Sequence, residues 1–372
     1  SLCKTWLNVL FLVFTNNEPI SVLQSIDKKF IITVLILLLL SISKSFGINL
    51  NTLNTEEGVT SLMYHRFDEN KYPSTNIKNE IFIEHLKEIN NSEIEFITFE
   101  KFEEIIKTGI KKNYLLLTID DAFKSFYLNA WPILKNKKIP FILFVSTEAI
   151  GKNGYMTWKQ IRELTSSNLV TIGNHSHTHE YLIDWKDSKI KSDLETSIKI
   201  FKEELGYSPE IFSYPFGEYS SNLKKIVSDF NFKFAFGQHS GVIDPTKDFL
   251  ELPRFPINEK YGEIKRFKSI LKTLPFPYES ITPENRYLKK DGNPPKVKIK
   301  FFKNLINIQN INCYSNEGNI WRKSDIQFIN ENELMILLKE KFKSERGRIN
   351  CSLWKENGKW RWLGIQYVIA EY

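Results

Sequence analysis

The sequence predicts an α/β fold in which helices cover a parallel sheet, followed by a smaller β-rich module. Between Val59 and about Leu274, short β-type runs alternate with stretches of helical periodicity. This alternation is typical of parallel strands arranged as a barrel or as a doubly wound sheet. After Pro275 the helical stretches give way to short alternating runs and turn residues, which indicates a second part built of strands.

The strands of the first part are expected where short apolar runs end at turn residues. These runs are 59–64, 95–98, 114–119, 140–145, 170–172, 211–214 and 233–236. Amphipathic stretches lie between them. One apolar stripe includes Ile81, Leu86 and Ile89, and another runs over 190–205 and ends at Gly206, the expected C-cap.

The second part begins after a stretch rich in proline. Residues 275–295 contain Pro277 and Pro283 and are expected to form a linker. Runs at 297–302, 311–314 and 325–329 then predict strands, and Asn357-Gly358 between two alternating runs predicts a β-hairpin. We therefore expect an α/β domain over 48–286 and a β-rich, sandwich-like module over 287–372.

The N-terminal 47 residues are expected to be a leader rather than part of the fold. Lys28-Lys29 precedes an apolar run over 30–40, and small and polar residues follow over 41–47. This pattern fits a secretory signal peptide, since the run is shorter than the roughly 20 residues that a spanning helix needs. An uncleaved anchor that holds the protein at a membrane or envelope is the alternative. Export to the periplasm, the envelope or the exterior would allow Cys313 and Cys351 to pair.

Composition excludes several classes of protein. Hydrophobic content of 42% and charged content of 26% are those of a globular chain. The net charge of +7 comes without a dense basic block, so nucleic acid is not an expected partner. Three cysteines are too few for a disulfide scaffold. The oligomeric state stays open.

Three polar clusters each follow directly after a predicted strand, where parallel α/β folds gather their active sites. The first is Asp120-Asp121, after the run 114–119. Adjacent side chains diverge at a strand end, so one carboxylate can bind a cation while the other handles a proton. Taken alone, the pair is also typical of a solvated loop or a helix cap.

The second cluster holds three of the six histidines, at His175, His177 and His179. In a straight strand the first and third would lie about 13 Å apart, but a bend would bring them together. With one carboxylate, two neutral imidazoles leave an open position on a tetrahedral zinc ion, as hydrolysis requires. His177 fits a spacer better than a ligand. A histidine-rich surface loop is the alternative.

The third cluster is a turn that contains Pro215, Phe216 and Gly217. Proline and glycine fix the turn, which could present a backbone N–H group to a developing oxyanion. An ordinary connection between a strand and a helix is the alternative.

Together and in this order, the clusters resemble the motifs of the polysaccharide deacetylase family, carbohydrate esterase family 4. That family has a Thr-Phe-Asp-Asp-Gly motif, a His-(Ser/Thr)-x-x-His motif and an Arg-x-Pro-Tyr motif. The segments 62–67 and 252–255 also resemble exported deacetylases that act on exopolysaccharides of the poly-N-acetylglucosamine type. The resemblance covers about residues 58–275. It implies a distorted (β/α) barrel.

The resemblance also implies roles for single residues. Asp121, His175 and His179 would hold a metal ion, zinc or another divalent transition metal. Asp120 would be the base that activates water, and the N–H group of Phe216 would stabilise the tetrahedral oxyanion.

The sequence departs from the family's motifs at two positions around the expected base, Asp120. Ala122 stands where the family usually has glycine. Ser213 replaces the arginine that normally braces the base, so another group must orient Asp120. Arg254 is the candidate.

A further departure concerns the general acid. The late histidine that usually fills this role has no counterpart, since no histidine follows His239. His239 is therefore the first candidate for the acid and His65 the second. Either imidazole could instead be a buried, hydrogen-bonded structural group.

The resulting functional hypothesis is an exported, zinc-dependent deacetylase that removes N-acetyl groups from an amino-sugar polysaccharide, such as poly-N-acetylglucosamine or a related envelope polymer. An O-acetyl glycan esterase is one alternative. A catalytically inactive glycan-binding protein is another, because the usual arginine and late histidine are missing. Trp354, Trp360 and Trp362 could form a sugar-stacking surface, although tryptophans of a small β-domain are also typical core residues.

Overall fold

The computed structural model describes residues 56–303, 305 and 307–370. These residues lie within one compact unit that spans 54–372. The expected leader over 1–47 lies outside the described residues and stays a prediction. Within the part of the chain that the structure describes, no helix has the length and apolar character to cross a membrane.

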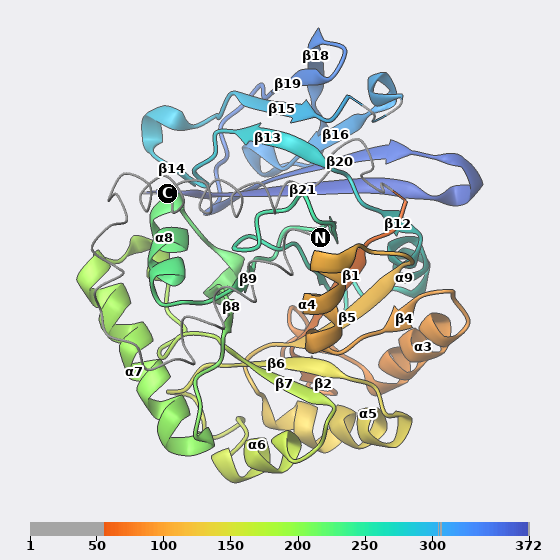
Figure 1. Ribbon diagram of the computed structural model, residues 1–372. Coiled ribbons are helices and arrows are strands. Elements are labelled where there is room, and N and C mark those ends of the chain that lie inside the picture. The colour runs from red at the N-terminus through yellow and green to blue at the C-terminus, as the bar shows by residue number, and fades with distance from the viewer. Residues whose placement is uncertain (1–55, 304, 306, 371–372) are drawn as a thin grey trace, which may run out of the picture. The chain divides into compact units, whose positions relative to one another are not determined.

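A curled, mainly parallel sheet forms the first part of the fold, with its strands in the order β10-β1-β5-β6-β7-β8-β9 (Figure 1). β11 also pairs with β1, and β4 also pairs with β5. The α/β class predicted from the sequence is therefore confirmed. The strands are β1 (Val59–Tyr64), β4 (Glu95–Phe96), β5 (Tyr114–Ile119), β6 (Phe141–Val145), β7 (Val170–Asn174), β8 (Ile211–Ser213), β9 (Phe234–Phe236), β10 (Val242–Ile243) and β11 (Phe255–Pro256). A separate two-stranded sheet pairs β2 (Arg66–Phe67) with β3 (Asn76–Ile77).

Both faces of this sheet are buried, as is typical of parallel sheets covered by helices. Along β5, Leu115 and Leu117 pack into one apolar cluster and Leu116 into another. The first cluster includes residues of α3, α5, α6 and α9, and the second includes residues of α4. Successive residues of a strand point to opposite faces, so one apolar run supplies two cores.

Seven α-helices of the described residues cover the sheet, and Figure 1 shows α5, α6, α7 and α8 along its outside. They are α3 (Asn79–Asn90), α4 (Phe99–Thr108), α5 (Trp131–Lys137), α6 (Trp158–Thr165), α7 (Asp187–Leu205), α8 (Ser221–Asp229) and α9 (Ile264–Leu271). α7 ends at Gly206, whose φ of 81° is the left-handed conformation that favours glycine. The predicted C-cap is confirmed.

The C-terminal region is β-rich and contains two further sheets, drawn in teal, cyan and blue in Figure 1. Apolar residues of both sheets share one cluster. One sheet contains β12 (Thr273–Leu274), β14 (Tyr287–Leu288), β16 (Asn312–Ser315), β17 (Arg322–Lys323), β20 (Arg346–Trp354) and β21 (Trp360–Ile369). The other contains β13 (Tyr278–Thr282), β15 (Val297–Phe301), β18 (Asp325–Asn330) and β19 (Glu333–Leu337).

The linker expected over 275–295 is wrong for two segments, because β13 and β14 lie in it. β13 pairs antiparallel with β15, and its Ile281 is buried in the shared core. Pro277 and Pro283 flank β13 rather than interrupt it, so they remove no hydrogen bond from the ladder. The division of the chain at 286/287 stays a prediction.

The predicted hairpin is formed by β20 and β21, and Asn357 and Gly358 both have positive φ in the connection. β20 separates two kinds of side chain. Residues such as Ile349 enter the apolar core, whereas Arg346 and Arg348 alternate with them and point to the opposite face. That face lines the cleft described below.

The predicted pairing of Cys313 with Cys351 is formed as a disulfide. The two residues are direct cross-strand neighbours in β16 and β20, and both are fully buried. The bond closes a loop with a sequence separation of 38 residues.

Replacing both cysteines by serine is expected to lower the free energy of unfolding by about 4 kcal/mol, the loop entropy that a cross-link of this length removes from the unfolded chain. Urea unfolding with and without reductant measures the effect. Reductant should shift the midpoint of the wild type but not that of the double variant. A wild-type midpoint that is insensitive to reductant would contradict the assignment.

Candidate active site

Three side chains with metal-binding atoms meet at the carboxyl ends of β5 and β7. The ligand atoms of Asp121, His175 and His179 all lie within 4.8 Å of one another. Asp121 Oδ1 is 3.5 Å from His175 Nε2 and 3.3 Å from His179 Nε2. Two imidazole nitrogens and one carboxylate oxygen match the donor set of a catalytic zinc site.

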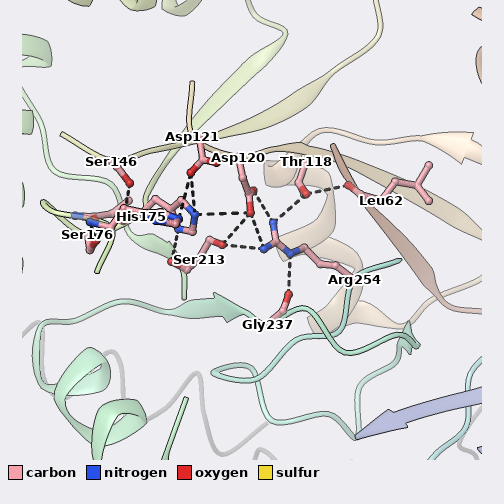
Figure 2. A network of polar contacts seen from close by, with 12 residues as sticks. Leu62, Thr118, Asp120, Asp121, Ser146, His175, Ser176, Ser213, Gly237 and Arg254 are labelled. Atoms are coloured by element: carbon pink, nitrogen blue, oxygen red, sulfur yellow. Dashed lines mark hydrogen bonds and ion pairs between the residues drawn. The ribbon is translucent and has the colours of Figure 1, made fainter. Parts of the chain in front are cut away.

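The hydrogen bonds of His175 fix its orientation toward this centre (Figure 2). Its Nδ1 atom is 2.7 Å from the carbonyl oxygen of Ser213, to which it donates, so Nε2 keeps its lone pair and faces Asp121. Burial lowers the pKa of His175 to about 4. The imidazole is therefore neutral at neutral pH, as a metal ligand must be. The residues present fit a divalent metal ion.

A bend after β7 brings the two histidines together. Ser176 and His179 both have left-handed backbone conformations, with φ of 67° and 55°. The rings of His175 and His179 consequently lie 4.7 Å apart, centre to centre. His177 is directed elsewhere, because its Nδ1 atom is 2.8 Å from the hydroxyl of Thr147.

Helix α7 holds this bend through a buried carboxylate that the sequence analysis missed. Asp193 accepts hydrogen bonds from the backbone N–H groups of His177, at 2.8 Å, and Thr178, at 3.1 Å. One turn later, Ser197 donates to Asn174 Oδ1 at 3.1 Å. Asp193 interrupts the apolar stripe of α7, and an acidic residue on the buried face of an amphipathic helix is the signal that could have revealed it.

Replacing Asp193 by alanine is expected to weaken zinc binding about 10- to 100-fold, because the loop between the two histidine ligands loses its anchor. Zinc titration against a competing chelator measures the change. Glu195→Ala is the matched control, since Glu195 is exposed on the same helix. Equal zinc affinities of the two variants would contradict an anchoring role.

Asp120 lies beside the metal-binding cluster and is paired with Arg254 (Figure 2). Both side chains are fully buried. The guanidinium donates to Asp120 Oδ1 at 2.7 Å and to Oδ2 at 2.9 Å. Burial raises the pKa of Asp120, but the charge and hydrogen bonds of Arg254 together with the nearby histidines outweigh it, and the pKa falls to about 2. Asp120 is consequently a carboxylate throughout the neutral range.

Ser213 and Arg254 both lie next to the carboxylate of Asp120. Arg254 Nη2 donates to Ser213 Oγ at 2.8 Å, and that hydroxyl lies 3.4 Å from Asp120 Oδ2. Arg254 is held in turn by the carbonyl of Gly237 at 2.9 Å. The arginine that orients Asp120 therefore comes from a distant segment, while serine fills the position next to it.

The backbone turns sharply after Asp120. Asp121 has φ of 71° and Ala122 has φ of 52°, so two consecutive residues are left-handed. A Cβ atom disfavours this conformation by about 1–2 kcal/mol. The turn explains why glycine suits the position of Ala122, and it aims the carboxylate of Asp121 at the histidines.

The third cluster forms a tight turn next to His179. The turn bonds run from Gly217 N–H to Tyr214 and from Glu218 N–H to Pro215, and so do not use the N–H group of Phe216. The Phe216 ring packs edge-on against His179, with centres 4.7 Å apart. A Cβ atom on Gly217 would meet Gln238 at 2.4 Å, so only glycine fits there.

Comparison with known proteins identifies this arrangement. Residues 107–235 match the family model described as Polysaccharide deacetylase. Residues 107–235 therefore have the sequence pattern of a polysaccharide deacetylase domain. A poly-beta-1,6-N-acetyl-D-glucosamine N-deacetylase of Staphylococcus aureus is 24% identical over 280 residues, which cover 64% of this chain and 97% of that protein. A putative polysaccharide deacetylase of Bacillus subtilis, YxkH, is 23% identical over 53% of this chain and 70% of its own length.

Solved structures support the fold of the deacetylase domain. IcaB from Ammonifex degensii matches 58% of this chain and 97% of its own, with 24% identity and a TM-score of 0.53. The Streptococcus pyogenes deacetylase PplD matches 57% of this chain and 99% of its own, with 20% identity and a TM-score of 0.52. The curled parallel sheet agrees with this fold.

The two candidate acids of the deacetylase domain differ in their surroundings, although both line the same cleft. His65 lies within electrostatic reach of the carboxylates of Asp120 and Asp121. The charged groups around His239 are cations, among them Arg254, and burial together with these cations lowers its pKa to about 3. Burial lowers the pKa of His65 as well, but the charges of Asp120 and Asp121 oppose that shift, whereas every charge around His239 adds to it. The surroundings therefore favour a protonated imidazole at His65 over one at His239.

The metal-binding cluster opens into a cleft of about 770 Å³. Asp121, His179 and Phe216 line it from the deacetylase domain. Arg348 and Trp362 of the hairpin β20–β21 line it from the C-terminal region. The C-terminal strands therefore form part of the wall of the cleft.

The three tryptophans singled out in the sequence have different environments. Trp354 and Trp360 are exposed near the end of the hairpin, at 58% and 37%. Trp362 is half-buried, donates to Asn350 and packs edge-on against Phe255. A core role is therefore wrong for Trp354 and Trp360, and of the three tryptophans only Trp362 lines the cleft.

Proposed function

We propose that this protein is a zinc-dependent hydrolase that removes N-acetyl groups from an amino-sugar polysaccharide, either poly-N-acetylglucosamine or a related envelope polymer. The observation that carries the proposal is a buried carboxylate, Asp120, fixed by Arg254 next to a cluster of three metal-binding side chains. Two of the relatives carry deacetylase names, and one is a poly-beta-1,6-N-acetyl-D-glucosamine N-deacetylase. The C-terminal module, which we interpret as sandwich-like, borders the same cleft.

Asp121, His175 and His179 would hold the metal ion, which supplies a Lewis acid for the acetyl carbonyl when it is bound. Asp120 accepts the proton of the attacking water. The bidentate contact with Arg254 favours its ionised form and fixes its direction. A base held in this way is ready to accept a proton without reorganisation.

Two further groups would act on the substrate. The N–H group of Phe216 stabilises the oxyanion that develops on the acetyl carbonyl, since the turn bonds leave it available. Departure of the amine needs an acid, and we assign this role to His65 because it lies in the cleft near both carboxylates.

The contact of Arg254 with Asp120 also bears on the inactive glycan-binding alternative. That alternative rests on the missing arginine of the third motif and the missing late histidine. Arg254 supplies an equivalent guanidinium from elsewhere in the chain, and His65 is the group proposed for the acid. An active enzyme is therefore the better proposal.

Acetate release tests the proposal. The full chain is incubated with β-1,6- and β-1,4-linked N-acetylglucosamine oligomers, with added zinc and with chelator. We expect zinc-dependent release from at least one oligomer. Release only from acetylated esters would favour the O-acetyl esterase, and no release from either class despite bound zinc would overturn the enzymatic proposal.

We also propose that the protein is exported, on the basis of the leader expected over 1–47 and the disulfide, which persists in oxidising compartments. Fractionation of cells that produce the full chain should place it in the envelope or the medium. A protein found only in the cytoplasm, with Cys313 and Cys351 reduced, would contradict export.

A further inference from the structure

The wall of the cleft carries an excess of positive charge that the deacetylation reaction does not require. Its lining contains four cationic side chains among the described residues, which are Lys260, Arg266, Arg346 and Arg348. The lining contains one carboxylate, that of the proposed metal ligand Asp121. A neutral glycan would leave this charge unused.

Only one of the four cations has an acidic partner among the described residues. Arg346 donates to the buried Glu218 at 2.6 Å. Arg348 instead donates to the neutral amide of Gln366 at 3.2 Å, and Arg266 to the backbone carbonyl of Tyr261 at 2.5 Å. A half-buried guanidinium without a counter-ion is unfavourable unless a ligand supplies the anion.

The two arginines of the hairpin are placed to reach a substrate in the catalytic centre. Arg346 and Arg348 are two residues apart on β20 and therefore share one face. The Arg346 guanidinium lies 5.5 Å from the centre of the Phe216 ring, which in turn contacts His179. One chain of contacts thus joins the cationic wall to the metal ligands.

Aromatic side chains accompany the cations on the same wall. Tyr314 and Trp321 line the cleft and are 44% and 50% exposed. Rings of this kind pack against the apolar faces of sugars, while an arginine fork binds carboxylate or phosphate oxygens in pairs. The combination suits a sugar polymer that carries acidic groups.

We infer that the substrate is an acidic N-acetylated polysaccharide, whose carboxylate or phosphate groups bind the arginines of β20 while the metal centre takes a neighbouring acetyl group. The inference rests on the proposed function and narrows its substrate class. Arg348 is the specificity-determining residue to test first, because no described carboxylate pairs with it.

The test compares three oligosaccharides of equal length on the full chain with zinc. One alternates N-acetylglucosamine with glucuronate, one is a neutral N-acetylglucosamine oligomer, and one is that neutral oligomer with phosphate on one sugar. We expect kcat/KM for the better acidic oligomer to exceed that for the neutral one about tenfold, mainly through KM, and to fall with added salt. The two acidic oligomers distinguish carboxylate from phosphate.

Arg348→Gln should lower the acidic-to-neutral ratio of kcat/KM about tenfold, and Arg348→Lys should retain part of it, since lysine keeps the charge but not the fork. Arg162→Gln is the matched control, because Arg162 is an exposed arginine on α6 outside the cleft. It removes the same charge and should leave the ratio unchanged. A wild-type preference for the neutral oligomer, or an acidic preference that survives Arg348→Gln, would overturn the inference while acetate release upholds the proposed function.

If no oligomer releases acetate, the proposed function fails. Binding of the oligosaccharides to the wild type then tests the inference on its own. Calorimetric titration with the same oligosaccharides measures it. Acidic binding that is tighter than neutral binding and is lost in Arg348→Gln upholds the inference. Equal binding of acidic and neutral oligomers overturns it.

Discussion

Replacing Asp120 by asparagine is expected to lower the rate of acetate release by about 10²- to 10⁴-fold, the usual contribution of a general base. Asparagine has nearly the same shape but cannot accept the proton of water. The metal-binding side chains are unchanged, so zinc content should remain that of the wild type. Rate and zinc content are measured on the same sample.

The same substitution should also destabilise the protein, because it leaves the buried Arg254 charge without a partner. Breaking a buried ion pair in this way typically costs about 3–5 kcal/mol. Urea unfolding measures this loss of folding free energy separately from the rate of acetate release. Asp291→Asn makes the same chemical change at an exposed position and should affect neither property. A folded, zinc-loaded Asp120→Asn variant with wild-type rate would show that the base lies elsewhere.

Replacing His179 by alanine is expected to reduce bound zinc from about one ion per chain to a small fraction at the same free zinc, since only two protein ligands would remain where catalytic zinc sites have three. Activity should fall in parallel. Zinc analysis after dialysis, together with acetate release, measures both.

His177→Ala is the matched control for this loss. It removes an imidazole from the same loop, but one that contacts Thr147 rather than the other ligands. Zinc content should stay near one. If His177→Ala lost zinc and His179→Ala retained it, the ligand assignment would be wrong.

Much of the first sheet could be predicted because its strands are short apolar runs with clear ends. The bounds of β1 and β5 agree with the predicted runs 59–64 and 114–119. β5 ends where two carboxylates follow the last apolar residue, since charged groups leave the core. The candidate site residues directly follow these strands, so predicting the strand ends also predicted that the residues lie together.

The rest depends on contacts between residues that are distant in the chain. Asp193 reaches the histidine loop across 16 residues, and the strand β13 is defined by its pairing with β15. The sequence pattern around Asp193 or β13 reflects only the neighbouring residues and does not identify the distant partner. The surroundings that separate His65 from His239, and the approach of Arg348 to the cleft, are likewise properties of the packed chain.

The disulfide affects the stage at which the protein becomes able to bind its polymer. It joins β16 and β20, the strands that carry Tyr314 and Arg348 on the wall of the cleft. A newly made chain in a reducing cytoplasm would lack this cross-link, although its metal-binding residues lie outside the joined strands. We therefore expect maturation in two stages, with the metal centre complete first and the polymer-binding wall fixed only after oxidation. If the protein is exported as we propose, such an order would delay polymer binding until after the chain reaches an oxidising compartment.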